Sequence, residues 1–286
     1  PDLAKQTVAD AVTIGVMSQP EDICLLRHDG SGKNAFKNPL SFRYLDDNFI
    51  ESDAVKIGKT FMDYLKKTKD PRIHVYCSLK DGNTEFDKQF GLPNGYDSHT
   101  IADAPSGSFV GLENTSNFNI NTILRLDAPT IFLMPSETKL LLAEAVLRNW
   151  TNGNAEVLYK EAITSSMKEQ EIAYGTQGKI TDEEIETYLA QNLFSTANNT
   201  EKLQIIGEQY WVATFINGYE SYANWRRTGY PKLIPTNYSG SMSPGVIPTR
   251  LPYPTDEYSI NRANVDTANQ QQGADKVTTH IWWDID

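Results

Sequence analysis

Acidic and amide side chains alternate along one stretch of the sequence, in the manner of the first half of a calcium-binding loop. They are Asp81, Asn83, Glu85 and Asp87. The full EF-hand pattern needs a glycine at the sixth position and a bidentate glutamate at the twelfth, and here these positions hold Phe86 and Leu92. We therefore interpret the stretch as a solvated polar hairpin and expect no bound metal.

The short patterns of common catalytic sites are also missing. There is no HExxH, GxSxG or P-loop pattern, and none of the four histidines stands beside a recognisable nucleophile. Carboxylate pairs of the glycosidase type stay open, because a sequence with 37 acidic residues does not show which of them face each other at about 5–10 Å. We expect a protein without catalysis or cofactor, and a secreted polysaccharide hydrolase is the alternative.

Residues 80–128 are the least regular part of the chain, and they keep aromatic side chains despite many glycines and prolines. A loop of this length in a compact domain is either functional or disordered, and its aromatic content favours an ordered, functional loop. An aromatic face beside polar groups suits a sugar ring, which has an apolar C–H face. The residues closest to that pattern are Asn94, Tyr96, Asp97 and His99. We predict that they bind ligand, with Tyr96 as the stacking residue; ordinary loop packing is the alternative for each.

The composition is that of an acidic globular protein. The chain has 286 residues, 39% of them hydrophobic, and a formal net charge of −11. A core can therefore form in one domain or two, and nucleic acid is not expected as a partner, since its binders need a basic face. No apolar run approaches the ~20 residues of a membrane span. We interpret Cys24 and Cys77 as buried free thiols, and whether they pair stays open.

Helical periodicity predicts most of the regular structure. In the first half, it indicates a helix near residues 3–11 and another that Ser52 caps and that stops before Asp70. Residues 72–76 alternate as a short strand, and residues 18–48 are expected to be irregular with a turn at 29–32.

The second half is more clearly helical. A helix begins at Pro135 with Ser136 as a cap, Asn149–Gly153 break it, and a second apolar stripe runs over residues 155–167. This pair resembles one tetratricopeptide unit. The capping box at Thr181 begins a third helix. The tail from Pro235 is expected to run as extended chain, with Trp282 and Trp283 anchoring its end.

One long aromatic helix is predicted between these elements. Thr200 is its expected cap, and Gly229 and Pro231 end it. Its aromatic residues occupy several faces, so we predict that Trp211, Phe215 and Tyr219 are buried.

The end of this helix carries a distinctive order of residues: Trp211, Phe215, Asn217, Gly218, Glu220, Trp225, Arg226, Arg227, Gly229, Tyr230 and Pro231. A second group follows downstream: Arg250, Pro252, Tyr253 and Pro254. In this order, the two groups resemble the signature of SusD/RagB-like outer-membrane lipoproteins. The resemblance covers roughly residues 36–286.

The resemblance implies a mostly α fold of tetratricopeptide-like helix pairs with large irregular loops. It implies a single SusD-like domain over residues 1–286, with helical repeats at 135–230 and an extended tail at 235–286. It further implies that a lipid-bearing N-terminal part precedes the chain. The function implied is non-catalytic capture of oligosaccharide, with a peptide as second choice, by a lipid-anchored protein on the outward face of the outer membrane. The implied partner is a SusC-like TonB-dependent transporter, and the alternative is a protein-binding scaffold.

Most signature residues are expected to be structural. Arg226 and Arg227 could grip a ligand anion. We favour a role in which they bond the carbonyls at the end of their own helix and pair with acids of the tail. Tyr230 and Tyr253 are likewise expected to pack.

Overall fold

The computed structural model describes residues 2–41, 56–96, 99–194, 196–238 and 240–284. The chain divides into two compact units. The first unit comprises residues 1–93 and 104–231, and the second comprises residues 94–103 and 232–286. Ser52, the predicted cap of an early helix, lies outside the described residues.

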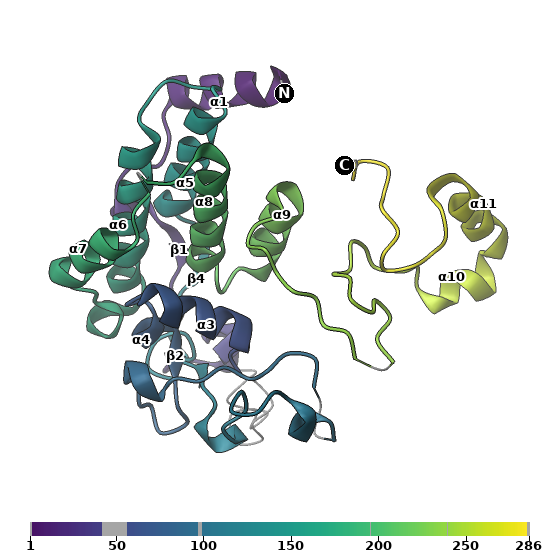
Figure 1. The fold of residues 1–286 in the computed structure, drawn as a ribbon, viewed down its shortest axis with the longest axis horizontal. Coiled ribbons are helices and arrows are strands. Elements are labelled where there is room, and N and C mark those ends of the chain that lie inside the picture. The colour runs from purple at the N-terminus through teal and green to yellow at the C-terminus, as the bar shows by residue number, and fades with distance from the viewer. Residues whose placement is uncertain (1, 42–55, 97–98, 195, 239, 285–286) are drawn as a thin grey trace. The chain divides into compact units, whose positions relative to one another are not determined.

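Helices dominate the first unit (Figure 1). They are α1 (Asp2–Ile14), α3 (Lys59–Thr68), α4 (Ile73–Tyr76), α5 (Pro135–Leu147), α6 (Ala155–Tyr174), α7 (Asp182–Gln191), α8 (Asn199–Ala213) and α9 (Gly218–Thr228). Two small antiparallel sheets accompany them. One pairs β1 (Cys24–Leu26) with β4 (Thr130–Leu133), and the other pairs β2 (Cys77–Ser78) with β3 (Asn117–Phe118). The mostly α architecture predicted from the sequence is confirmed.

The pair α5 and α6 forms the helical centre of this unit, and α8 packs against it. The turn between the pair falls where Asn149–Gly153 was predicted to break the helix, and Asn154 then caps α6 by accepting from the Glu156 and Val157 N–H groups. Apolar residues from all three helices meet in one core, among them Leu140, Ile163 and Val212, each at most 1% exposed. The helix pair predicted at residues 135–167 is therefore present.

Ser136 does not cap α5. The N-cap position is Met134, and the Ser136 hydroxyl lies inside the first turn, where it donates to Glu169 of α6 at 2.6 Å. Its backbone N–H donates to the same carboxylate at 2.8 Å. Burial is the largest influence on this carboxyl and raises the pKa of Glu169, although the serine donors oppose it. A carboxylate on the neighbouring helix thus does what the cap was expected to do.

The long aromatic helix is in fact two helices. Asn198 rather than Thr200 caps α8, in a capping box with Glu201. The chain turns after Ala213, and Asn217 caps α9 by accepting from the Glu220 N–H. Trp211 and Phe215 are half-buried against the core, but Tyr219 is 94% exposed, so its predicted burial is wrong. The prediction fails because it counts helical spacing continuously from α8. The chain turns between Ala213 and Gly218, so residues of α9 do not lie on the faces that this spacing predicts.

Phe215 supports the turn between these helices. Its ring stacks on Phe61 with centroids 4.2 Å apart. We expect Phe215→Ala to lower the free energy of unfolding by about 3 kcal/mol in a urea titration, because a packed aromatic ring is lost. Tyr219→Ala, on the exposed side of the same turn, should stay within about 0.5 kcal/mol of the parent protein. A loss below about 1 kcal/mol for Phe215→Ala would contradict this packing.

Two predictions for the first half of the chain are also wrong. Residues 73–76 form one helical turn instead of a strand, because the Asp70 carboxylate accepts from the Arg72 N–H and the Arg72 carbonyl accepts from Tyr76. Residues 18–48 contain β1, whose partner strand lies more than a hundred residues away. The turn at 29–32 is present, with the Asp29 side chain accepting from the Ser31 N–H. Both cysteines are free, but Cys24 is exposed and only Cys77 is buried.

The second unit contains helices where extended chain was predicted. They are α10 (Thr255–Ile260) and α11 (Arg262–Gln272). Val265 of α11 is 4% exposed, so these helices bury an apolar side chain that the polar composition of the tail concealed. Trp282 and Trp283 are 82% and 51% exposed, and their role as anchors of the tail stays a prediction.

Candidate functional site

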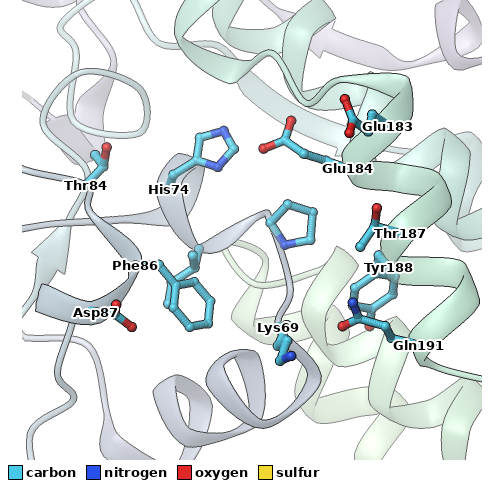
Figure 2. Close-up of a pocket in the computed structure, with 12 residues that line it drawn as sticks. Lys69, His74, Thr84, Phe86, Asp87, Glu183, Glu184, Thr187, Tyr188 and Gln191 are labelled. Carbon is cyan, nitrogen blue, oxygen red and sulfur yellow. The ribbon is translucent and has the colours of Figure 1, made fainter.

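A pocket of about 680 Å³ opens in the first unit, on one side of α7 (Figure 2). This size falls within the range of about 300–1,000 Å³ that small-molecule sites occupy. The lining residues come from α7, from the segment around α4 and from the 3-10 turn η3 (Phe86–Lys88). They are Lys69, Pro71, Ile73, His74, Thr84, Phe86, Asp87, Glu183, Glu184, Thr187, Tyr188 and Gln191.

The first wall is one face of α7. Thr181 begins this helix in the predicted capping box: its hydroxyl accepts from the Glu184 N–H, and the Glu184 carboxylate accepts from the Thr181 N–H at 2.8 Å. Glu184, Thr187, Tyr188 and Gln191 follow at helical spacing, so their side chains share one side of the helix. The cap therefore sets both the start of α7 and the polar groups that it presents.

The opposite wall is aromatic and apolar. Phe86 of η3 faces the pocket, and Pro71 is another apolar lining residue. The turn that carries Phe86 is held from behind by the buried side chain of Gln89, which donates to the carbonyls of Asn83 and Glu85 at 2.9 and 3.2 Å. Phe86 is partly buried against the core, so its ring has a fixed position with one part still accessible.

A buried polar network holds the base of the pocket. Asp70 and Arg72 form an ion pair in which both side chains are 0% exposed. Arg72 also donates to Gln209 at 2.7 Å, and Gln209 in turn donates to the Tyr188 hydroxyl at 2.7 Å. Burial would lower the pKa of Arg72, but Asp70 raises it, and the guanidinium stays charged. The Tyr188 side chain is thus held by groups from α8 and from the segment just before α4, and the wall is preorganised.

The pocket is acidic on balance. Glu183, Glu184 and Asp87 contribute carboxylates, and Lys69 is the one lysine among the lining residues that the structure describes. For Glu184, burial raises the pKa. The hydrogen bonds from Thr181 and the electrostatic influence of the nearby His74 outweigh burial and hold the pKa below its usual value. His74 contacts the Lys179 carbonyl oxygen through Nε2 at 3.3 Å, a distance at which a protonated Nε2 donates. Such a site can accept hydrogen bonds and attract positive charge.

The ligand residues predicted from the sequence lie in the second unit and do not line this pocket. Asn94 and His99 are exposed and Tyr96 is half-buried. Asp97 lies outside the described residues. Gly95, between Asn94 and Tyr96, has a φ of +85°. A Cβ at this position would lie 2.9 Å from the Thr236 Cβ, so the glycine lets the segment approach residue 236 closely.

The alternating acids of residues 81–87 bond locally. The Asp81 side chain accepts from the Asn83 N–H, and the Asn83 side chain accepts from the Glu85 N–H. Lys88 pairs with Glu85 at 3.2 Å. Within the described ranges, no group of three or more His, Cys, Asp or Glu side chains is arranged to hold a metal ion.

The arginines of the first signature group contact their surroundings in the same unit. Arg227 donates through both terminal nitrogens to Glu144 of α5, at 2.7 Å each, and so ties α9 to α5. The partner acid is on α5 and not in the tail, where it was predicted. Burial raises the pKa of Glu144, but Arg227 and Arg148 lower it by more, so the pKa lies below its usual value and the carboxyl is ionised. The Arg226 guanidinium lies over the Tyr222 ring at 5.9 Å.

The second signature group organises the second unit. Arg250 pairs with Asp275 at 2.8 Å, and both side chains are less than a tenth exposed. The same carboxylate accepts from the Tyr253 N–H and from the Tyr258 hydroxyl. The Tyr253 hydroxyl accepts from Gln272 at 2.9 Å, so Arg250 and Tyr253 are held in place by residues of α11 and beyond.

Sequence reasoning did not find the pocket. Its walls come from residues about a hundred positions apart, and each has an ordinary local explanation: Thr181 as a cap and Phe86 as loop packing. The one signal available was the capping box, which fixes the start of α7 and hence the residues on each of its faces. Which face meets η3 depends on tertiary packing.

Comparisons with known proteins agree with the fold. The family model described as SusD-like, "Susd and RagB outer membrane lipoprotein", matches residues 1–284. A solved structure of a chitin-binding protein is 28% identical with a TM-score of 0.77, over 99% of this chain and 60% of its own. A Bacteroidetes SusD-like structure is 24% identical with a TM-score of 0.78, over 100% and 66%. A chitin-binding SusD homolog from Flavobacterium johnsoniae is 23% identical with a TM-score of 0.70, over 96% and 57%.

The chain thus spans about 60–66% of the length of the first two solved structures. No curated protein sequence matches it. In the part of the chain that the structure describes, no helix has the length and apolar character needed to cross a membrane. The match over residues 1–284, together with the helical fold shared with these structures, shows that the chain belongs to the SusD-like family of outer membrane lipoproteins.

Proposed function

We propose that this protein captures oligosaccharides at the outer membrane without cleaving them and delivers them to a SusC-like TonB-dependent transporter. The observation that carries the proposal is the family match over residues 1–284, joined to 28% identity with a chitin-binding protein across nearly the whole chain. A lipid anchor, as the family description implies, would hold the protein at the outer membrane. A peptide remains the second choice of ligand.

The geometry supports binding better than catalysis. The pocket beside α7 is concave, has an aromatic wall and carries several hydrogen-bonding groups, the usual combination of a sugar site. Its side chains also include hydroxyl and amide groups, from Thr84, Thr187 and Gln191, which can bond sugar hydroxyls.

The test is a panel of soluble polysaccharides, chitin oligomers among them, in affinity electrophoresis with the whole chain. We expect retardation by at least one glycan. Prolonged incubation followed by reducing-end analysis should show no shortening of the retained glycan. Shortening that disappears when a single carboxylate is replaced would establish a hydrolase instead.

The segment 94–99 is a second proposed contact for the glycan, with Tyr96 stacking on a sugar ring. We expect Tyr96→Ala to weaken glycan binding by about 1–3 kcal/mol, the scale of one aromatic contact. Its effect on the free energy of unfolding should stay near 0.5 kcal/mol, because Tyr96 is half-buried in a loop. Calorimetric titration and thermal unfolding of the same sample measure both. Intact binding with a large fall in melting temperature would place Tyr96 in packing.

A further inference from the structure

Charge is distributed unevenly along the pocket beside α7. Figure 2 shows Glu183 and Glu184 together at one end, with the Glu184 carboxylate turned toward the His74 ring, and Lys69 at the other end. Phe86 stands on the wall across from α7. A ligand that lies against Phe86 therefore has two carboxylates near one of its ends.

Glu184 keeps its negative charge, since its pKa lies below the usual value. The hydrogen bonds that Glu184 accepts come from the backbone and hydroxyl of Thr181, at 2.8 and 2.7 Å, and both donors are uncharged. The neighbouring acid Asp182 pairs with Lys168 at the start of the same helix. The position of Glu184 in the first turn of α7 stabilises its ionised form further. The acidic end can therefore attract a cationic group of a ligand.

We propose that the pocket binds an oligosaccharide of amino sugars whose primary amine is protonated, with the amine beside Glu183 and Glu184 and one ring face against Phe86. This assignment rests on the proposed function and names a ligand class for it. A ring with an apolar face and equatorial hydroxyls matches an aromatic wall beside Thr84, Thr187 and Gln191. An acetylated amine carries no charge and gains nothing from the two carboxylates.

The rigidity of the pocket adds to the argument. Tyr188 at its base is fixed through Gln209 to the buried pair of Asp70 and Arg72, and Gln89 holds the turn that carries Phe86. Because both walls are held by buried polar groups, little ordering is needed when a ligand binds. A peptide amine shares the cationic group but has no rigid ring face for Phe86, so it is the weaker match.

The experiment compares a fully deacetylated chitin trimer with its N-acetylated counterpart in calorimetric titrations of the whole chain. Below the pKa of the sugar amine, we expect the deacetylated trimer to bind about tenfold more tightly, the effect of two exposed ion pairs. The preference should shrink in high salt and disappear above the pKa of the amine. The double variant Glu183→Gln/Glu184→Gln should lose the preference, since glutamine keeps the cap but not the charge.

Two further variants separate the possible outcomes. Glu186→Gln removes an exposed charge of α7 that does not line the pocket, and it should keep the preference. Phe86→Ala should weaken the deacetylated trimer severalfold while far-ultraviolet circular dichroism shows a folded chain. The assignment is overturned if both trimers bind equally, if the preference survives in the double variant, or if a lysine-containing tripeptide binds more tightly than the sugar. If one of these outcomes is found but other glycans still bind, only the amino-sugar assignment fails and the proposed function stands. If no glycan binds at all, the assignment and the proposed function both fail.

Discussion

Replacing Arg72 with alanine is expected to lower the free energy of unfolding by about 3–5 kcal/mol, because it leaves the Asp70 carboxylate buried without its cation. Both side chains of this pair are 0% exposed, and Arg72 also donates to Ser166 and Gln209. A urea titration followed by circular dichroism measures the loss. The double variant Asp70→Asn/Arg72→Met should be less destabilised than Arg72→Ala, since no buried charge remains.

The chain offers a matched control with the same spacing. Arg125 and Asp127 also form a pair across one intervening residue, but their side chains are 37% and 45% exposed. Arg125→Ala should cost about 1 kcal/mol or less, even though it also removes a hydrogen bond to the Tyr174 carbonyl. Equal losses for Arg72→Ala and Arg125→Ala would mean that the Asp70–Arg72 pair is not the buried centre described above.

Replacing Glu137 with glutamine is expected to stabilise the protein in alkaline solution and to have little effect in acid. Glu137 lies on α5 and is 6% exposed, and burial, followed by the nearby Glu220 and Glu169, raises its pKa from 4.5 to about 8. A raised pKa means that the folded protein holds a proton that the unfolded chain releases. The contribution of this carboxyl is thus fully favourable below pH 4.5 and is lost as the pH rises to about 8.

The size of the effect follows from the shift. One pKa unit corresponds to about 1.4 kcal/mol, so with a pKa raised from 4.5 to about 8 Glu137→Gln should gain on the order of 5 kcal/mol above pH 8 relative to its effect in acid. Urea titrations at several pH values check this. Glu144 on the same helix is the control, because Arg227 and Arg148 lower its pKa and Glu144→Gln should instead destabilise most at neutral pH. A gain for Glu137→Gln that does not change with pH would contradict the assignment.

Local signals predict the helices whose apolar stripe, cap or break lies within the helix or directly beside it. The α5–α6 pair has a clear apolar stripe and a break at Asn149–Gly153, and α7 has its capping box. Prediction failed where distant partners decide the structure. The carboxylate that accepts the hydrogen bond from Ser136 belongs to Glu169 of α6, and β1 forms only by pairing with β4. The alternation of residues 72–76 predicts a strand, but the buried Asp70 side chain accepts from the Arg72 N–H where a helical turn starts. A side-chain contact of this kind leaves no periodic pattern in the sequence.

The candidate site shows the same limit. An irregular loop with aromatic residues is typical of recognition and points to Tyr96 and its neighbours, and this site stays a prediction. The pocket beside α7 depends instead on how η3 and α7 face each other. Phe86 and Glu184 are about a hundred residues apart, and neither is distinctive in its own segment. Such a site follows from packing, which a single sequence does not specify.

The most direct test of the central claim is a calorimetric titration of the whole chain with chitin oligomers of increasing length, acetylated and deacetylated. We predict saturable binding whose affinity rises with length and then levels off, with the oligomers recovered unchanged. A folded sample that gives no saturable heat with any oligomer of this series, or with the glycans of the electrophoresis panel, would contradict the proposal that this protein captures oligosaccharides.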